Sequence, residues 1–172
     1  MAETFELWFL GRTATLRVNA TLSQLAHRTG YWYHQINHNG HPQEYAISKA
    51  HGPGTRDWEV HAVMSSDLPE EVGKAIRWLD AREIAGDPLV RMLIAPAYHL
   101  TAFWLEAADR NNVLVIACPA WFSRLQKEQL YDEREFLSLL AQEQPAQATP
   151  RRATQFSAPP NIPTSPPFAS KS

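Results

Sequence analysis

The sequence predicts an α+β protein, in which an antiparallel sheet of about six to eight strands carries two to three helices packed on it. A disordered, proline-rich C-terminal tail is expected after this domain. Three observations predict this class. Several strand-like runs follow one another without an intervening helix, as in antiparallel sheets. Other segments repeat apolar residues at helical spacing. From residue 141 onward the chain holds 7 of its 13 prolines but no glycine, tryptophan or tyrosine.

The first elements are expected to be short. Residues 5–10 alternate in the manner of a strand, and residues 11–12 are expected to turn the chain into a second strand. A short helix is expected next, capped by Asn19 or Thr21 and running through His27 or Arg28. Gly30 follows its end, where a left-handed conformation is least costly for glycine.

Residues 31–48 are predicted to form a β-hairpin, because the Asn-Gly dipeptide at 39–40 favours a type I′ turn between two strand-like runs. If these two residues are the loop, opposite residues have numbers that sum to 79. This register places Trp32 opposite Ile47. It also places the proline of the second strand where its missing N–H breaks no hydrogen bond of the hairpin.

The second half of the domain is also predicted to contain both strands and helices. Residues 58–65 alternate as a strand, and Asp67 is expected to cap a helix over about 68–83. Three further strand-like runs follow. Of these, 98–106 fits a helix as well as a strand, and the last is apolar throughout, as in strands buried on both faces. A final helix is expected from about Asp132.

Residues 1–142 therefore form one predicted α+β domain, and residues 143–172 a Pro/Ser/Ala-rich tail. The tail has too few apolar residues to offset the entropy of ordering it, so we expect it to be disordered. The order of elements in the domain is similar to that of small bacterial secretion chaperones, without a shared motif. That likeness of topology implies a chaperone-like arrangement and says little about function.

Composition excludes several classes of function. The 16 basic and 18 acidic residues give a net charge of -2, which argues against nucleic acid as a partner. The single cysteine excludes an internal disulfide and fits a reducing compartment, so a cytoplasmic location is expected. The longest aliphatic run is far too short for a membrane span. The first residues lack the basic start of a signal peptide.

Cys118 and His99 are the candidates for catalysis, as the nucleophile and base of a small hydrolase-like enzyme. They fall on neighbouring predicted strands. However, Pro119 follows the cysteine, so no helix that would lower the thiol pKa begins there, and no nucleophile motif surrounds it. The simpler interpretation is a buried structural thiol.

His38 and His41 are the candidates for a metal site, because the predicted hairpin register places them opposite each other beside the turn. No motif supplies further ligands, and exposed turn residues are the simpler interpretation. No phosphate-binding or other cofactor motif is present, so we expect no cofactor.

The aromatic residues point to a protein contact. Six tryptophans and five tyrosines all precede residue 132, more than a small core is expected to hide. Exposed aromatic patches with polar rims mark protein-binding surfaces. The candidate partner-binding residues are Tyr31, Tyr33 and Trp78 in the domain and Phe156, Ile162 and Phe168 in the tail.

The pattern therefore favours a non-catalytic protein-binding or assembly module of the cytoplasm, such as an adaptor or a homo-oligomer. Its expected partner is another protein or a second copy of the chain. The alternative is an enzyme that uses Cys118 with His99, or a metal site at His38 and His41.

Overall fold

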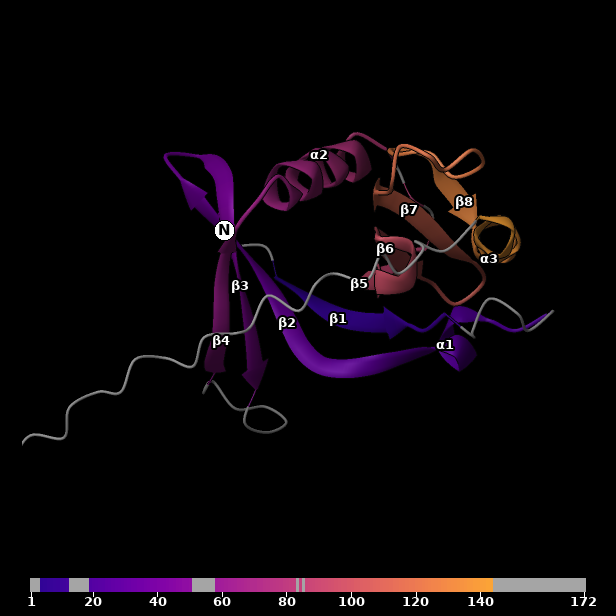
Figure 1. Cartoon of the computed structure of the whole chain (residues 1–172), viewed down its shortest axis with the longest axis horizontal. Helices are drawn as coiled ribbons and strands as arrows, with labels where there is room; N and C mark the ends of the chain where they lie inside the picture. The colour runs from indigo at the N-terminus through magenta and orange to yellow at the C-terminus, as the bar shows by residue number, and fades with distance from the viewer. Residues whose placement is uncertain (1–3, 13–18, 51–57, 83, 85, 144–172) are drawn as a thin grey trace, which may run out of the picture.

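The computed structural model describes residues 4–12, 19–50, 58–82, 84 and 86–143 of the chain. A 3-10 turn at Pro96–Tyr98 links two of its strands. In chain order the other elements are β1 (Thr4–Leu10), α1 (Leu22–Leu25), β2 (Ala26–His38), β3 (His41–Ala50), β4 (Trp58–Ser65), α2 (Leu68–Asp80), β5 (Leu89–Ala95), β6 (Leu100–Glu106), β7 (Asn111–Ala117), β8 (Leu130–Asp132) and α3 (Glu133–Gln142) (Figure 1).

The eight described strands form one sheet in the order β4-β3-β2-β1-β5-β6-β7-β8. Neighbouring strands are antiparallel except β1 and β5, which run parallel. The parallel pair arises because α2 carries the chain from the β4 edge back across the sheet, so β5 enters beside β1 in the same direction. The predicted α+β class is confirmed, with this pair as the one exception to an antiparallel sheet.

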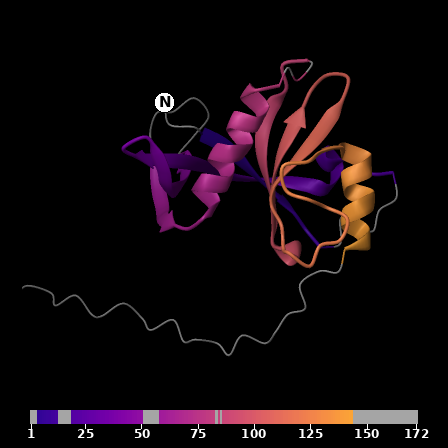
Figure 2. The same ribbon diagram turned by 90° about the horizontal axis from the view of Figure 1, so that it is seen from above.

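Helices cover both faces of the sheet, but only over part of its width. On one face, α2 packs Val72 and Ala75 into a core that includes Phe103. It reaches from β3 to β7 (Figures 1 and 2). On the opposite face, α1 and α3 enclose a second core that includes Phe136. Residues 113–116 of β7 lie between the two cores and are buried, as their apolar sequence predicts.

The predicted helix over residues 21–28 is mostly strand. Only α1 is helical, and the chain enters β2 at Ala26 because β1 supplies a strand with which these residues pair, including Trp8 opposite Arg28. Gly30 has the positive φ that we expected, +77°, but it lies inside β2 and not after a helix. The ladder with β1 is irregular at this point, and β2 curves strongly in Figure 1.

The tight turn of the hairpin forms as predicted. Asn39 has φ +52° and Gly40 φ +82°, and a type I′ turn needs positive φ at both positions. His38 and His41 are the pair that closes it.

The predicted register of the hairpin is wrong beyond the turn. A β-bulge leaves Gln43 without an opposite residue, so Trp32 pairs with Ser48 and not with Ile47. The bulge lies directly after Pro42. Proline has no N–H for the ladder, and within sheets it is found at edges and bulges.

The cap and the length of α2 also differ from prediction. The side chain of Asp67 makes no capping hydrogen bond, because this residue already has nearly helical angles, φ -74° and ψ -12°. Ser66 takes the role: its Oγ accepts a hydrogen bond of 3.2 Å from the backbone N–H of Leu68. The helix ends at Asp80, three residues before the expected end.

The remaining expectations divide into three groups. The ambiguous segment 98–106 is the end of the 3-10 turn followed by β6, and α3 begins after Asp132 as expected. The short strand β8 was not predicted. The second strand expected after residue 12 and the tail from residue 144 lie outside the described residues.

Candidate functional site

The strand β4 at the end of the sheet exposes apolar side chains along its length. Trp58 is 41% exposed, Val60 58%, Val63 57% and Met64 39%. These are four of the six large apolar residues that are exposed in the described part of the chain. Among the described residues, β3 is the only strand paired with β4, so the outer edge of β4 is an open sheet edge.

The exposure follows from where α2 lies. This helix contacts β3, and α1 and α3 lie over the other end of the sheet, so no helix among the described residues packs extensively on β4. Figure 1 shows β4 at the far side of the sheet from α3. A strand that is paired at one edge only, and covered on neither face, leaves its apolar side chains in water.

One face of β4 continues into an aromatic cluster. The ring of Trp58 stands edge-on to Trp32, with 5.6 Å between centroids and 87° between planes, and edge-on to His34 at 5.3 Å. Val60 and Val63 lie on the same face, because they pair through β3 with Trp32 and His34 respectively. We call Trp32, His34, Trp58, Val60 and Val63 the Trp58 face.

His34 anchors the cluster. Its Nδ1 lies 3.2 Å from Thr4 Oγ1, and its Nε2 makes a short contact with Ser48 Oγ. Burial lowers the pKa of His34 below its ordinary value of about 6.5. The imidazole is therefore neutral at pH 7, so the Trp58 face carries no formal charge on its five defining side chains.

Ion pairs border the Trp58 face on the side of β1. Glu6, which pairs with Trp32, forms an ion pair with Arg28 and lies 3.2 Å from Arg91 Nη1. Arg91 also bonds Glu106 at 2.5 Å. An apolar centre with a polar rim is the usual anatomy of a protein interface.

The three aromatic residues of the domain that were predicted to bind a partner lie in different surroundings. Tyr33 is 1% exposed and stacks on Tyr45 at 5.1 Å, so its side chain belongs to the core and not to a surface. Tyr31 is half-buried, with its ring edge-on to His61. Trp78 is half-buried beneath Arg82, whose guanidinium lies 3.8 Å from the ring centroid. Neither Tyr31 nor Trp78 lies on the Trp58 face.

The predicted tail anchors Phe156, Ile162 and Phe168 lie outside the described residues.

Cys118 and His99 are not brought together. The thiol of Cys118 points to the carbonyl of Leu125, at 3.7 Å, and burial raises its pKa, which leaves little thiolate at neutral pH. His99 is exposed at the end of the 3-10 turn, with its ring 6.4 Å from that of Trp121. In the described part of the chain no hydrogen bond joins the thiol to an imidazole, as a nucleophile and its base require.

His38 and His41 form a cross-strand pair at the exposed hairpin tip, as predicted. His38 Nε2 lies 2.9 Å from Glu44 Oε2. No group of three or more histidine, cysteine, aspartate or glutamate side chains in the described ranges is placed to hold a metal ion. The pair by itself offers two of the three or four ligands that a specific site needs.

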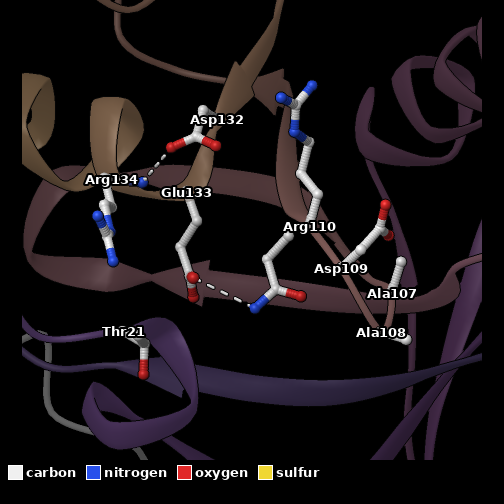
Figure 3. Close-up of a pocket in the computed structure, with 9 residues that line it drawn as sticks. Thr21, Ala107, Ala108, Asp109, Arg110, Asp132, Glu133 and Arg134 are labelled. Atoms are coloured by element: carbon white, nitrogen blue, oxygen red, sulfur yellow. Dashed lines mark hydrogen bonds between the residues drawn. The ribbon is translucent and has the colours of Figure 1, made fainter. Parts of the chain in front are cut away.

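A polar pocket of about 340 Å³ lies where α1, β7 and α3 meet (Figure 3). Glu133, only 6% exposed, accepts a 2.6 Å hydrogen bond from the backbone N–H of Leu22 and a 3.2 Å bond from Asn111 Nδ2. Arg110 and Arg134 stand at its sides. The buried carboxylate thus ties three elements together, and we assign it a structural role.

Comparisons with known proteins add no family. No family model, no curated protein and no solved structure matches the chain. No helix of the described residues is long and apolar enough to cross a membrane.

The residues that stand out in the structure are not among the predicted site residues. Residues 58–65 were predicted only as a strand, in which Trp58, Val60, Ala62 and Met64 alternate with Glu59, His61 and Val63. That alternation is typical of any half-buried strand. Local sequence carries no signal that tells an inner strand from an edge strand whose faces are both open.

Proposed function

We propose that the protein is a non-catalytic protein-binding module of the cytoplasm that uses β4 and the Trp58 face as its contact surface. The observation that carries the proposal is the exposure of Trp58, Val60, Val63 and Met64 on a single open edge strand. Contiguous apolar surface of this kind, with a polar rim, is typical of interaction sites.

The geometry favours an extended protein segment as the bound element. An open edge offers a row of backbone N–H and C=O groups to which a further strand can add, and the side chains beside it select the added sequence. Trp58 and Val60 would contact apolar side chains at alternate positions of such a strand. The proposed ligand is therefore a strand with apolar residues at every second position.

The two alternatives have no such support. The thiol of Cys118 and the ring of His99 have separate partners, and the histidine pair at the hairpin tip lacks further ligands among the described residues. We therefore develop neither the hydrolase nor the metal site.

The proposal can be tested with displayed peptides. A library of twelve-residue peptides is selected on the immobilised full-length protein, and binders are measured against Val63→Lys and Leu89→Lys. The two residues are equally exposed, at 57%, but Leu89 begins β5 and lies away from β4. We expect Val63→Lys to weaken binding about tenfold or more, since a tenfold change needs ~1.4 kcal/mol. Leu89→Lys should bind like the wild type.

Two results would contradict the proposal. One is a selection that yields no binder, and the other is a set of recovered peptides that bind Val63→Lys as tightly as the wild type. In either case β4 is not the contact surface. Melting temperatures of both variants provide the check that they fold, which we expect because both positions are on the surface.

A further inference from the structure

The two edges of the sheet are built differently. At one end β8 has three residues, and short edge strands are a common protection against unwanted pairing. At the other end β4 has eight residues, and its sequence WEVHAVMS contains no lysine, arginine or proline. Those are the residues with which monomeric proteins block an edge. The β4 edge therefore lacks lysine, arginine and proline, and the protective features that remain are the charge of Glu59 and a β-bulge at His61.

A β-bulge in β4 sets which residues share a face. Val60 pairs with Ser48 and Ala62 with Ile47, so His61 is the extra residue between them. The ring of His61 lies against Tyr31, on the face that α2 covers elsewhere. The bulge shifts the alternation by one residue. Residues 58, 60, 63 and 65 consequently lie on one face, and residues 59, 61, 62 and 64 on the other.

The assignment of residues to the two faces of β4 reads the same in both directions from the midpoint between His61 and Ala62. An antiparallel pair of identical strands related by a two-fold axis must place each residue opposite one on the same face. Only one register does so along the whole of β4, the register in which opposite residue numbers sum to 123. A shift of one residue in one direction sets Trp58 opposite Met64, and a shift in the other direction sets Glu59 opposite Ser65; in both cases the two residues lie on different faces.

The contacts in this register are complementary. Val60 lies opposite Val63 of the second copy, twice by symmetry, and Trp58 lies opposite the small Ser65. Glu59 lies opposite Met64, and the two copies of Glu59 are five residues apart along the strands, roughly 17 Å, so they do not repel strongly. Glu59 is the only acidic residue of β4.

We infer that the bound strand is β4 of a second copy, and that the protein forms a two-fold dimer whose sheets join through antiparallel β4 strands. This inference rests on the proposed use of β4 as the contact surface and names its partner. A single strand pair is a small interface, so the dimer should dissociate on dilution in the micromolar range.

Disulfide trapping tests the register. In a Cys118→Ala background, one protein carries Val60→Cys and a second carries Val63→Cys; a further set uses Glu59→Cys and Met64→Cys. Neighbouring pairs alternate between hydrogen-bonded and closer non-hydrogen-bonded geometry, so one of the two sets has the closer spacing. We expect mixtures of the matched proteins to cross-link at least tenfold faster than either protein alone. In the unmixed proteins the two cysteines are roughly 10 Å apart at positions 60 and 63 and roughly 17 Å apart at positions 59 and 64, both beyond disulfide reach.

Sedimentation equilibrium of the full-length chain tests the dimer itself. We expect a reversible dimer that Val63→Lys weakens at least tenfold and Leu89→Lys leaves unchanged. A chain that stays monomeric and gives no mixed cross-link overturns the second-copy inference. Peptides that still bind β4 would then keep the proposed function. A dimer that cross-links equally fast in mixed and unmixed proteins overturns the register.

Discussion

The indole of Trp58 stands edge-on to the indole of Trp32, with ring centroids 5.6 Å apart. Two indoles at this distance couple electronically, so we expect a couplet from the strong indole transition in the far-ultraviolet circular dichroism of the folded protein. Trp58→Ala should weaken the couplet without abolishing it, because Trp8 and Trp104 form a second edge-on pair at 5.3 Å. It should lower the free energy of unfolding by at least about 0.5–1.5 kcal/mol, the contribution of an edge-to-face pair beyond the area that it buries.

The matched control is Trp121→Ala, which removes another exposed tryptophan, whose ring partner is His99. Its spectrum should retain the couplet. A couplet that Trp58→Ala leaves unchanged in size would show that the indoles of Trp58 and Trp32 do not pack in solution.

His34 should make stability depend on pH. Burial lowers the pKa of His34 in the folded protein. The unfolded chain therefore binds this proton near pH 6.5, and the folded protein binds it only at a lower pH. The contribution of His34 to stability is thus complete above pH 6.5 or so and is lost as the pH falls toward the lower folded pKa. Melting temperatures at pH 7.5 and 5.0 should therefore differ more for the wild type than for His34→Gln.

His41→Gln, at an exposed position beside the turn, is the control. It should keep the wild-type difference in melting temperature between pH 7.5 and 5.0. If the wild type and His34→Gln show the same difference in melting temperature between the two pH values, the pH dependence does not come from His34.

Glu143 should mark the end of the folded domain. Its Oε1 accepts hydrogen bonds from the backbone N–H groups of Ser123, Arg124 and Leu125, at 3.0, 2.7 and 3.3 Å. A chain cut after Gln144 keeps this carboxylate, and its melting temperature should stay within about a degree of the full chain. Glu143→Ala should cost about 2–3 kcal/mol, because three backbone N–H donors lose a charged acceptor, and the hydrogen bond from Leu125 is buried while the other two are partly buried.

Differential scanning calorimetry of the chain cut after Gln144 and of Glu143→Ala, each beside the full chain, measures the two effects. Equal melting temperatures for Glu143→Ala and the wild type would mean that these hydrogen bonds do not hold the 123–125 segment.

Cys118 should behave as a structural thiol. Burial raises its pKa, so a thiol reagent at pH 7 should label the native protein at least about tenfold more slowly than the chain in denaturant. Cys118→Ala should lower the free energy of unfolding by about 1 kcal/mol, through the loss of a partly buried side chain. Labelling that is as fast before as after denaturation would show that the thiol is open to solvent.

Local signals predicted the elements that depend on neighbouring residues. Asp132 caps α3 as expected, with its carboxylate accepting a 3.0 Å hydrogen bond from the N–H of Arg134. The register of the hairpin could not be predicted in the same way. The turn alone sets it at His38 and His41, but the bulge at Gln43 shifts every later pair, including the one that Trp32 makes.

The sequence by itself determined the type I′ turn at 39–40, the start of α3 and the apolar stripe of α2, because turn angles, caps and helical spacing each involve residues a few positions apart. Only the tertiary structure decided that Tyr33 is buried and that Trp58, Val60 and Val63 are exposed. Their exposure depends on where α2 crosses the sheet and on which strand lies at its edge. Both are set by pairing between distant segments, about which the alternation within one strand says nothing.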